Sequence, residues 1–224
     1  MAFTLVRLRF DSDFQRGASA TSYQNQTWAS IVSHFVDHPD APLSIHNMLK
    51  GKIPGVWISP SESVRIMARL VSESRILRAY VAEESGISTS AVQSLMGSKA
   101  LFIAVPMRLN AHQYFDVSVY QEAILRLFRL PQFRGFVGGD CWGESYFFPA
   151  ASRSYLYIMD PSTTQKALDT SNLDIPSQPR IVAMRWPRLD SSMVFGFYVE
   201  SMEDLERLKS ELIKNSILPF VFKN

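Results

Sequence analysis

The 224-residue sequence is poor in cysteine, and Cys141 is its only one. A lone cysteine excludes an intramolecular disulfide, and with it a disulfide-stapled secreted scaffold, as well as a zinc site built from several cysteines. The four histidines, His34, His38, His46 and His112, lack the His-Glu-x-x-His spacing of zinc peptidases. We therefore expect no cofactor, and we expect a protein of a reducing compartment, the cytoplasm.

Long apolar runs and charge of one sign are also scarce. No stretch reaches the roughly 18–20 apolar residues of a transmembrane helix, and the first residues lack the apolar core and cleavage site of a signal peptide. The 23 basic and 21 acidic residues are spread along the chain and leave a net charge of +2. Without a basic block, binding to nucleic acid has little support. The sequence thus predicts no transmembrane segment and no nucleic-acid partner.

What is present fits a globular protein. Hydrophobic residues make up 46% of the chain and aromatic residues 12%. A chain of this length can bury roughly 70–75% of the surface that it exposes when unfolded, so it needs no disulfide or metal to fold. There is no Gly/Ser-rich linker and no internal repeat. We predict a segment of uncertain structure over residues 1–27, with a strand from Phe3 to Phe10, and a single domain over residues 28–224.

Apolar periodicity and capping residues predict the helices and strands. The clearest helix start is Ser59-Pro60 followed by Glu62, a capping box with proline at the first helical position. The expected helices cover residues 28–37, residues 43–50, a segment from Pro60, residues 88–96, a segment after Asp116 and a segment after Ser201. The expected strands cover residues 77–82, 100–105, 135–137, 145–148, 155–159, 181–186, 194–199 and 218–222. Helices that come early and strands joined by short turns predict an α+β fold with a mainly antiparallel sheet flanked by helices.

Two motifs lie between Gly138 and Gln165. Gly138-Gly139 is followed after a short gap by Tyr146-Phe147, and the strand over 155–159 runs into Asp160-Pro161-Ser162-Thr163-Thr164-Gln165. This order resembles the autophagins, the papain-like cysteine peptidases of autophagy. Their pattern is Gly-Gly-Lys-Pro, a short gap, Tyr-Phe, and a strand ending in Leu-Asp-Pro-His-Thr-Thr-Gln. Further segments resemble the family in the same order: Ser44-Ile45-His46, Gly55-Val56-Trp57-Ile58-Ser59-Pro60, Val105-Pro106-Met107-Arg108-Leu109, Leu130-Pro131-Gln132 and Val194-Phe195-Gly196-Phe197-Tyr198.

The resemblance implies a papain-like fold and a partner. Autophagins cut the tail of the ubiquitin-like autophagy modifier (GABARAP-type) after a glycine and release the modifier from phosphatidylethanolamine, which implies transient proximity to a membrane. Asp160 matches the aspartate that orients the catalytic histidine, and Trp57 matches a tryptophan that covers the cleft. Gly138 and Gly139 match a flexible loop that gates the cleft. We therefore expect Asp160 to face a cleft, with Trp57 near it.

The chain departs from the family at two of the three catalytic positions. It has no Gly-Trp-Gly-Cys motif, and Ser162 stands where the family has its histidine. A hydroxyl group cannot replace imidazole as a base near neutral pH. Cys141 follows the glycine pair, and no helix pattern starts there, so we interpret it as a loop thiol open to oxidation and not as a relocated nucleophile. His46 and His112 are interpreted as surface or capping residues and not as displaced bases.

The sequence therefore predicts an autophagin homologue that is inactive as this chain stands and acts by binding the modifier. Two alternatives stay open at this point. One is an active cysteine peptidase whose nucleophile segment precedes this sequence, and the other is a structural or regulatory interaction protein unrelated to autophagy. Without the helix that carries the nucleophile, we also expect a cleft open on one side, with apolar surface around Trp28 and Trp57.

Overall fold

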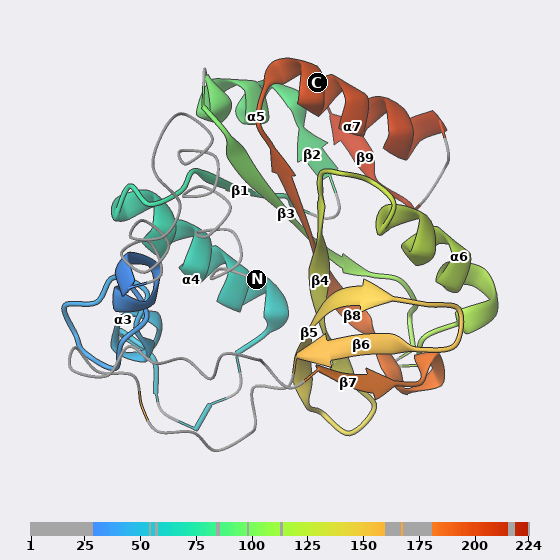
Figure 1. Ribbon diagram of the computed structural model, residues 1–224, viewed down its shortest axis with the longest axis horizontal. Helices are drawn as coiled ribbons and strands as arrows, with labels where there is room; N and C mark the ends of the chain where they lie inside the picture. Colours follow the sequence, from blue (N-terminus) through green and yellow to red (C-terminus); the bar gives the residue numbers. More distant parts are fainter. Residues whose placement is uncertain are drawn as a thin grey trace. The chain divides into compact units, whose positions relative to one another are not determined.

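The computed structural model describes residues 29–53, 55–56, 58–83, 86–97, 99–112, 114–159, 167, 181–214 and 218–223 (Figure 1). The described residues divide into two compact units. Unit 1 contains residues 78–159 and 181–223, and unit 2 contains residues 29–77 and residue 167. Residues 1–28 lie outside the description, so the strand expected from Phe3 to Phe10 and the boundary at residues 27 and 28 remain predictions.

Unit 2 is helical. A short helical segment covers residues 29–33, α3 covers Ile45–Met48 and α4 covers Pro60–Glu73. The predicted start of α4 is confirmed: Pro60 is its first residue, and the Ser59 hydroxyl accepts the backbone N–H of Glu62 at 3.1 Å. The Glu62 carboxylate pairs with Lys52. The local capping chemistry that was legible in the sequence therefore sets where α4 begins.

Unit 1 is built on a seven-stranded sheet in the order β1-β3-β8-β4-β5-β6-β7 (Figure 1). Its strands are β1 (Ala79–Val81), β3 (Leu101–Arg108), β4 (Phe133–Asp140), β5 (Ser145–Ala151), β6 (Leu156–Met159), β7 (Ile181–Met184) and β8 (Leu189–Val199). β1 and β3 are parallel, and the other neighbours in this sheet are antiparallel. β2 (Gly86–Ser88) and β9 (Val221–Lys223) form a separate parallel pair. The predicted mainly antiparallel α+β architecture is confirmed.

Three helices of unit 1 begin at capping residues. Ser88 caps α5 (Thr89–Met96) and Asp116 caps α6 (Val117–Leu127), each through a side-chain oxygen that accepts a backbone N–H three residues later. The Ser201 hydroxyl accepts the N–H of Asp204 at 3.2 Å at the start of α7 (Met202–Lys214). All three starts were predicted, because a cap lies within one turn of the group that it satisfies.

Prolines move two strand boundaries from their predicted places. The segment expected as a strand over 181–186 leaves the sheet at Met184 and continues as a 3-10 turn, η1 (Trp186–Arg188), which contains Pro187. The last expected strand, over 218–222, begins only at Val221, after Pro219. Proline lacks the N–H that a strand donates to its neighbour, so pairing ends before it or starts after it.

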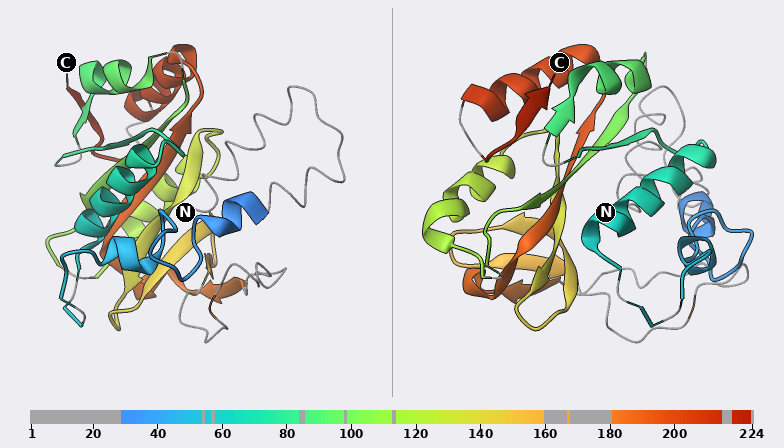
Figure 2. Two further views of the ribbon diagram at one scale, coloured as in Figure 1. Left: turned by 90° about the vertical axis from the view of Figure 1, so that its left-hand side faces the viewer. Right: turned by 180° about the vertical axis from the view of Figure 1, so that it is seen from behind.

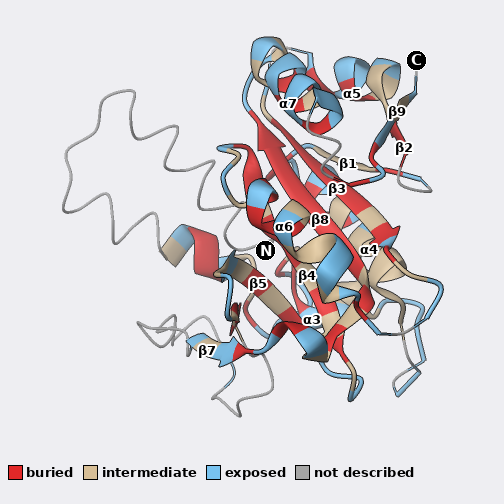
Figure 3. Ribbon diagram, turned by 90° about the vertical axis from the view of Figure 1, so that its right-hand side faces the viewer, coloured by how far each residue is buried: buried red, intermediate tan, exposed pale blue. Residues whose placement is uncertain are grey.

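The core of unit 1 lies along the two long strands β3 and β8. Residues 101–105 of β3 and 193–199 of β8 are all buried (Figure 3). An aromatic column joins β8 to β4 and β5: the centres of the Phe136 and Phe148 rings are 4.4 Å apart, and the Phe195 ring lies 5.7 Å from Phe136. The predicted burial of β3 on both faces follows from its unbroken apolar run.

The two ends of this sheet carry different elements. α5, α7, β2 and β9 lie at one end of unit 1, and the strands β5, β6 and β7 lie toward the other end (Figure 2). α7 begins at Met202, soon after β8 ends at Val199, whereas η1 directly precedes the first residue of β8. The end of the sheet that holds η1 also holds the turn between β4 and β5, and the candidate site lies there.

Candidate functional site

The predicted site residues fall into two groups. Asp160, Ser162 and Trp57, together with Trp28, lie outside the described residues, so the expected closeness of Asp160 and Trp57 and the expected apolar surface remain predictions. Gly138, Gly139 and Cys141 are described. The described part of the site therefore consists of these residues and the ends of the strands that surround them.

Strand register brings the glycine pair and the end of β6, the strand that precedes Asp160, to one end of the sheet. Gly139 in β4 pairs with Ser145 in β5, on either side of the turn over residues 141–144. β6 ends at Met159, which pairs with Phe147 of β5 and with Ile181 of β7. Because antiparallel neighbours alternate in direction, the carboxyl ends of β4 and β6 lie at the same end of the sheet. The glycine pair and the strand that precedes Asp160 therefore meet there.

Gly138 and Gly139 are strand residues. The resemblance implied a flexible loop, whereas the structure places both inside β4, where Gly138 pairs with Tyr146 on one side and with Met193 of β8 on the other. A residue hydrogen-bonded within a sheet on both sides has few conformations open to it. The implied loop is corrected to a shorter segment, the turn over residues 141–144.

A buried carboxylate organises that turn. The Asp140 side chain is 0% exposed. Its Oδ1 accepts the backbone N–H of Trp142 at 3.0 Å and that of Glu144 at 3.1 Å. Its Oδ2 accepts Nη2 of Arg188 at 2.8 Å. Gly143 completes the turn with a φ of +89°, a left-handed conformation that glycine adopts without strain.

The electrostatics of Asp140 follow from these contacts. Burial by itself would raise the pKa of Asp140, because a low-dielectric surrounding disfavours the charged form. The hydrogen bonds from Arg188, Trp142 and Glu144 outweigh burial and hold the pKa of Asp140 below its ordinary value. The carboxylate is therefore charged at neutral pH and paired with the Arg188 cation.

Trp142 is the most prominent side chain of the turn. It is 72% exposed, and the guanidinium carbon of Arg188 lies 3.8 Å from the centre of its indole ring. The Arg188 side chain is 37% exposed. Guanidinium groups stack on indole faces through cation–π attraction, so Arg188 holds both the buried carboxylate and the exposed ring.

In the sequence, Cys141 lies between Asp140 and Trp142, the two residues whose side chains contact Arg188. It is a half-buried free thiol, and its backbone N–H donates to the carbonyl of Arg188 at 2.9 Å. It sits in a turn between strands and not at the start of a helix, as the sequence predicted. Arg188 is the residue that sequence reasoning missed, because it follows Asp140 by 48 positions and no local pattern links them.

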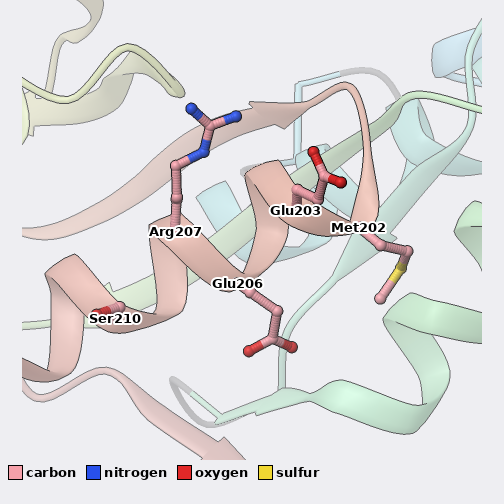
Figure 4. A pocket seen from close by; sticks show the side chains of 5 residues that line it. All are labelled: Met202, Glu203, Glu206, Arg207 and Ser210. Carbon is pink, nitrogen blue, oxygen red and sulfur yellow. The ribbon is translucent and has the colours of Figure 1, made fainter.

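Other candidate groups belong to other elements of the chain. His46 Nε2 is 2.9 Å from Asp37 Oδ1 in unit 2, as part of a partly exposed pair. The described residues contain no cluster of three or more His, Cys, Asp or Glu that could hold a metal ion. An open hollow of about 510 Å³ runs along α7, lined by Met202, Glu203, Glu206, Arg207 and Ser210 (Figure 4). It follows the carboxyl end of β8, at the opposite end of that strand from η1 and the β4–β5 turn, and its described lining contains no cysteine or histidine.

Comparison with known proteins decides the family. A family model described as the peptidase C54 catalytic domain matches residues 1–211 of the chain. The chain belongs to the peptidase C54 family. This C54 assignment confirms the resemblance to the autophagins and the papain-like α+β fold that the sequence predicted.

Individual relatives are distant and longer. A probable cysteine protease atg4 of Aspergillus clavatus is 26% identical over 242 residues, which cover 97% of the C54 chain and 59% of the relative. Cysteine protease ATG4C of Xenopus laevis is 28% identical over 215 residues, with 86% and 46% covered. Its Homo sapiens counterpart is 28% identical over 207 residues, with 82% and 44% covered. The C54 chain thus spans about half the length of the curated relatives that it matches.

The longest helix among the described residues of the C54 chain, α4, has 14 residues. Within the part of the chain that the structure describes, every helix is too short or too polar to cross a lipid bilayer.

Proposed function

We propose that this C54 chain binds the ubiquitin-like autophagy modifier (GABARAP-type) in the cytoplasm and does not cleave it. One observation carries the proposal: Ser162 stands in Asp160-Pro161-Ser162, where the family pattern has histidine. A serine hydroxyl holds its proton near neutral pH and cannot serve as a general base. Loss of a triad's base removes most of its chemical acceleration, whereas binding of the substrate depends on other contacts.

The surroundings of Cys141 support the same interpretation. Attack by a cysteine needs a thiolate, which is favoured by a helix N-terminus or an adjacent histidine. Cys141 follows a strand, and its N–H is bound to the Arg188 carbonyl at 2.9 Å. The carboxylate beside it, Asp140, is buried and paired with Arg188, so it adds no free base.

A second candidate is an active cysteine peptidase whose nucleophile lies outside these 224 residues. The coverage of the relatives favours it, because the chain matches only 59% of the Aspergillus clavatus protein and 46% of the Xenopus laevis protein. In that protein Ser162 would still stand where the family has its catalytic histidine, so another residue would have to act as the base.

A cleavage assay tests the catalytic half of the proposal. The purified chain is incubated with the modifier carrying its C-terminal extension, and no cleavage is expected from the wild type, from Cys141→Ser or from Ser162→His. Cleavage by the wild type that Cys141→Ser abolishes would overturn the proposal and make Cys141 a nucleophile. Cleavage that survives Cys141→Ser in a repurified sample would also overturn it, with the nucleophile elsewhere.

A titration tests the binding half. Calorimetry with the processed modifier is expected to give saturable binding, weakened in Trp57→Ala and Asp160→Ala. Arg207→Ala is the matched control, because Arg207 is exposed on α7 beyond the far end of β8 and should leave the affinity unchanged. No saturable binding up to about 100 μM modifier, a concentration that reveals even weak complexes, would refute the binding role.

A further inference from the structure

Three contacts tie Arg188, at the junction of η1 and β8, to the turn between β4 and β5. Nη2 of Arg188 donates to Oδ2 of Asp140 at 2.8 Å, and the Arg188 carbonyl accepts the N–H of Cys141 at 2.9 Å. The guanidinium carbon lies 3.8 Å from the centre of the Trp142 ring. An ion pair, a backbone hydrogen bond and a stacking contact thus converge on one residue.

We propose that Asp140, Cys141 and Arg188 form a latch that holds the β4–β5 turn in a single position against the start of β8. The latch makes the turn a fixed part of the sheet end and not a gate. It is a property of the chain by itself and goes beyond the proposed function, because it does not depend on which partner binds.

The geometry inside the turn makes the latch rigid. The two oxygens of Asp140 divide their roles: Oδ1 holds the turn through the N–H groups of Trp142 and Glu144, and Oδ2 holds Arg188. Hydrogen bonds to a charged, buried carboxylate are stronger than those between neutral groups. Movement of the turn away from Arg188 would therefore leave a buried charge without its partner, which is costly.

The latch uses the two residues at which this chain departs from the Gly-Gly-Lys-Pro pattern. Asp140 occupies the lysine position and supplies the carboxylate, whereas a lysine there would bring a second cation toward Arg188. Cys141 occupies the proline position and supplies an N–H, which proline lacks. Each departure creates one of the two hydrogen bonds to Arg188, and the family residues could make neither.

One polar group of the latch lacks a hydrogen-bond partner among the described residues. The Nε of Arg188 is buried and has no hydrogen-bond acceptor among the described residues. An unmet buried donor lowers the net stability of the contact. We therefore expect the amides of the turn to be less protected from hydrogen exchange than those of the core strands. Opening of the turn can then be measured.

Hydrogen exchange of the intact chain tests the latch. The amides of Trp142 and Glu144 are expected to be protected in the wild type. In Asp140→Lys/Cys141→Pro, which restores the family pair, they should exchange roughly tenfold faster or more, as expected when a hydrogen bond to a charged group is lost. The amides of Phe195 and Phe197 in β8 should exchange at the same rate as in the wild type, and this result would show that the variant is folded.

Single substitutions distinguish loss of the latch from a general destabilisation of the fold. Arg188→Gln is expected to speed exchange of the turn, whereas Arg185→Gln is the matched control, since Arg185 is an exposed arginine whose cation lies over the Tyr155 ring instead. Unprotected Trp142 and Glu144 amides in the wild type would overturn the proposal without any variant. Equal turn exchange in Arg188→Gln and the wild type would overturn it as well.

Discussion

The buried Asp140 carboxylate predicts how the stability of unit 1 responds to acid. The pKa of Asp140 is held below its ordinary value in the folded chain, since the bonds from Arg188, Trp142 and Glu144 outweigh the effect of burial. A carboxyl group whose folded pKa is lowered contributes stability that is fully present above the unfolded pKa, about 3.9. That stability is lost as the pH falls through the folded pKa. We therefore expect the contribution of Asp140 to be complete at pH 7, to decline below about pH 4 and to be lost once the pH falls below the lowered folded pKa.

The size of the contribution follows from the contacts that Asp140→Asn removes. An asparagine keeps an oxygen for the N–H groups of Trp142 and Glu144, but it turns its NH₂ group toward Nη2 of Arg188, which is also a donor. A hydrogen bond to a charged group contributes about 1.5–3 kcal/mol. Because Arg188 is 37% exposed, water replaces part of the lost bond, and we expect a loss of about 1–2 kcal/mol at pH 7.

Urea unfolding followed by circular dichroism measures this loss. The free energy of unfolding of Asp140→Asn should fall below that of the wild type at pH 7, and the difference should shrink as the pH approaches 3. Glu144→Gln is the matched control, because it removes an exposed carboxylate from the same turn. If Asp140→Asn is as stable as the wild type at pH 7, or if the difference is unchanged at pH 3, the assignment of a charged, stabilising carboxylate is refuted.

Three further predictions concern single sites. Phe136→Ala removes a fully buried ring stacked on Phe148 and should lower the free energy of unfolding by about 3–5 kcal/mol in urea; a loss under about 1 kcal/mol would contradict the aromatic column. Ser59→Ala removes the cap of α4 and should cost about 1 kcal/mol, whereas Ser63→Ala, inside the helix, should cost less. Gly143→Ala forces a φ of +89° on alanine and should cost about 1–2 kcal/mol, and an unchanged melting temperature would show that the turn adapts.

The sequence predicted what is determined locally. The starts of α4, α5 and α6 were legible because Ser59, Ser88 and Asp116 satisfy N–H groups within the next turn. The apolar run of β3 identified a strand buried on both faces. The family motifs further indicated the fold, because their order along the chain is retained even where single residues differ.

Contacts between distant segments could not be predicted in the same way. Asp140 and Arg188 are 48 residues apart, and nothing near either residue marks the other as its partner. Gly138 and Gly139 look like loop residues in isolation, yet both pair with β5, and Gly138 also pairs with β8, which makes them part of a strand. Asp160 and Trp57 lie outside the described residues, so their closeness still rests on the resemblance.

The order of the sheet has a consequence for how the chain is made. β8 lies between β3 and β4, yet it is the last of the seven strands to leave the ribosome. Until Val199 has been synthesised, β3 and β4 lack their common neighbour, and each presents an open edge that can pair with other chains. Unit 1 therefore completes its sheet only after β8 has been synthesised, and we expect the open edges of β3 and β4 to be prone to pairing with other chains until then.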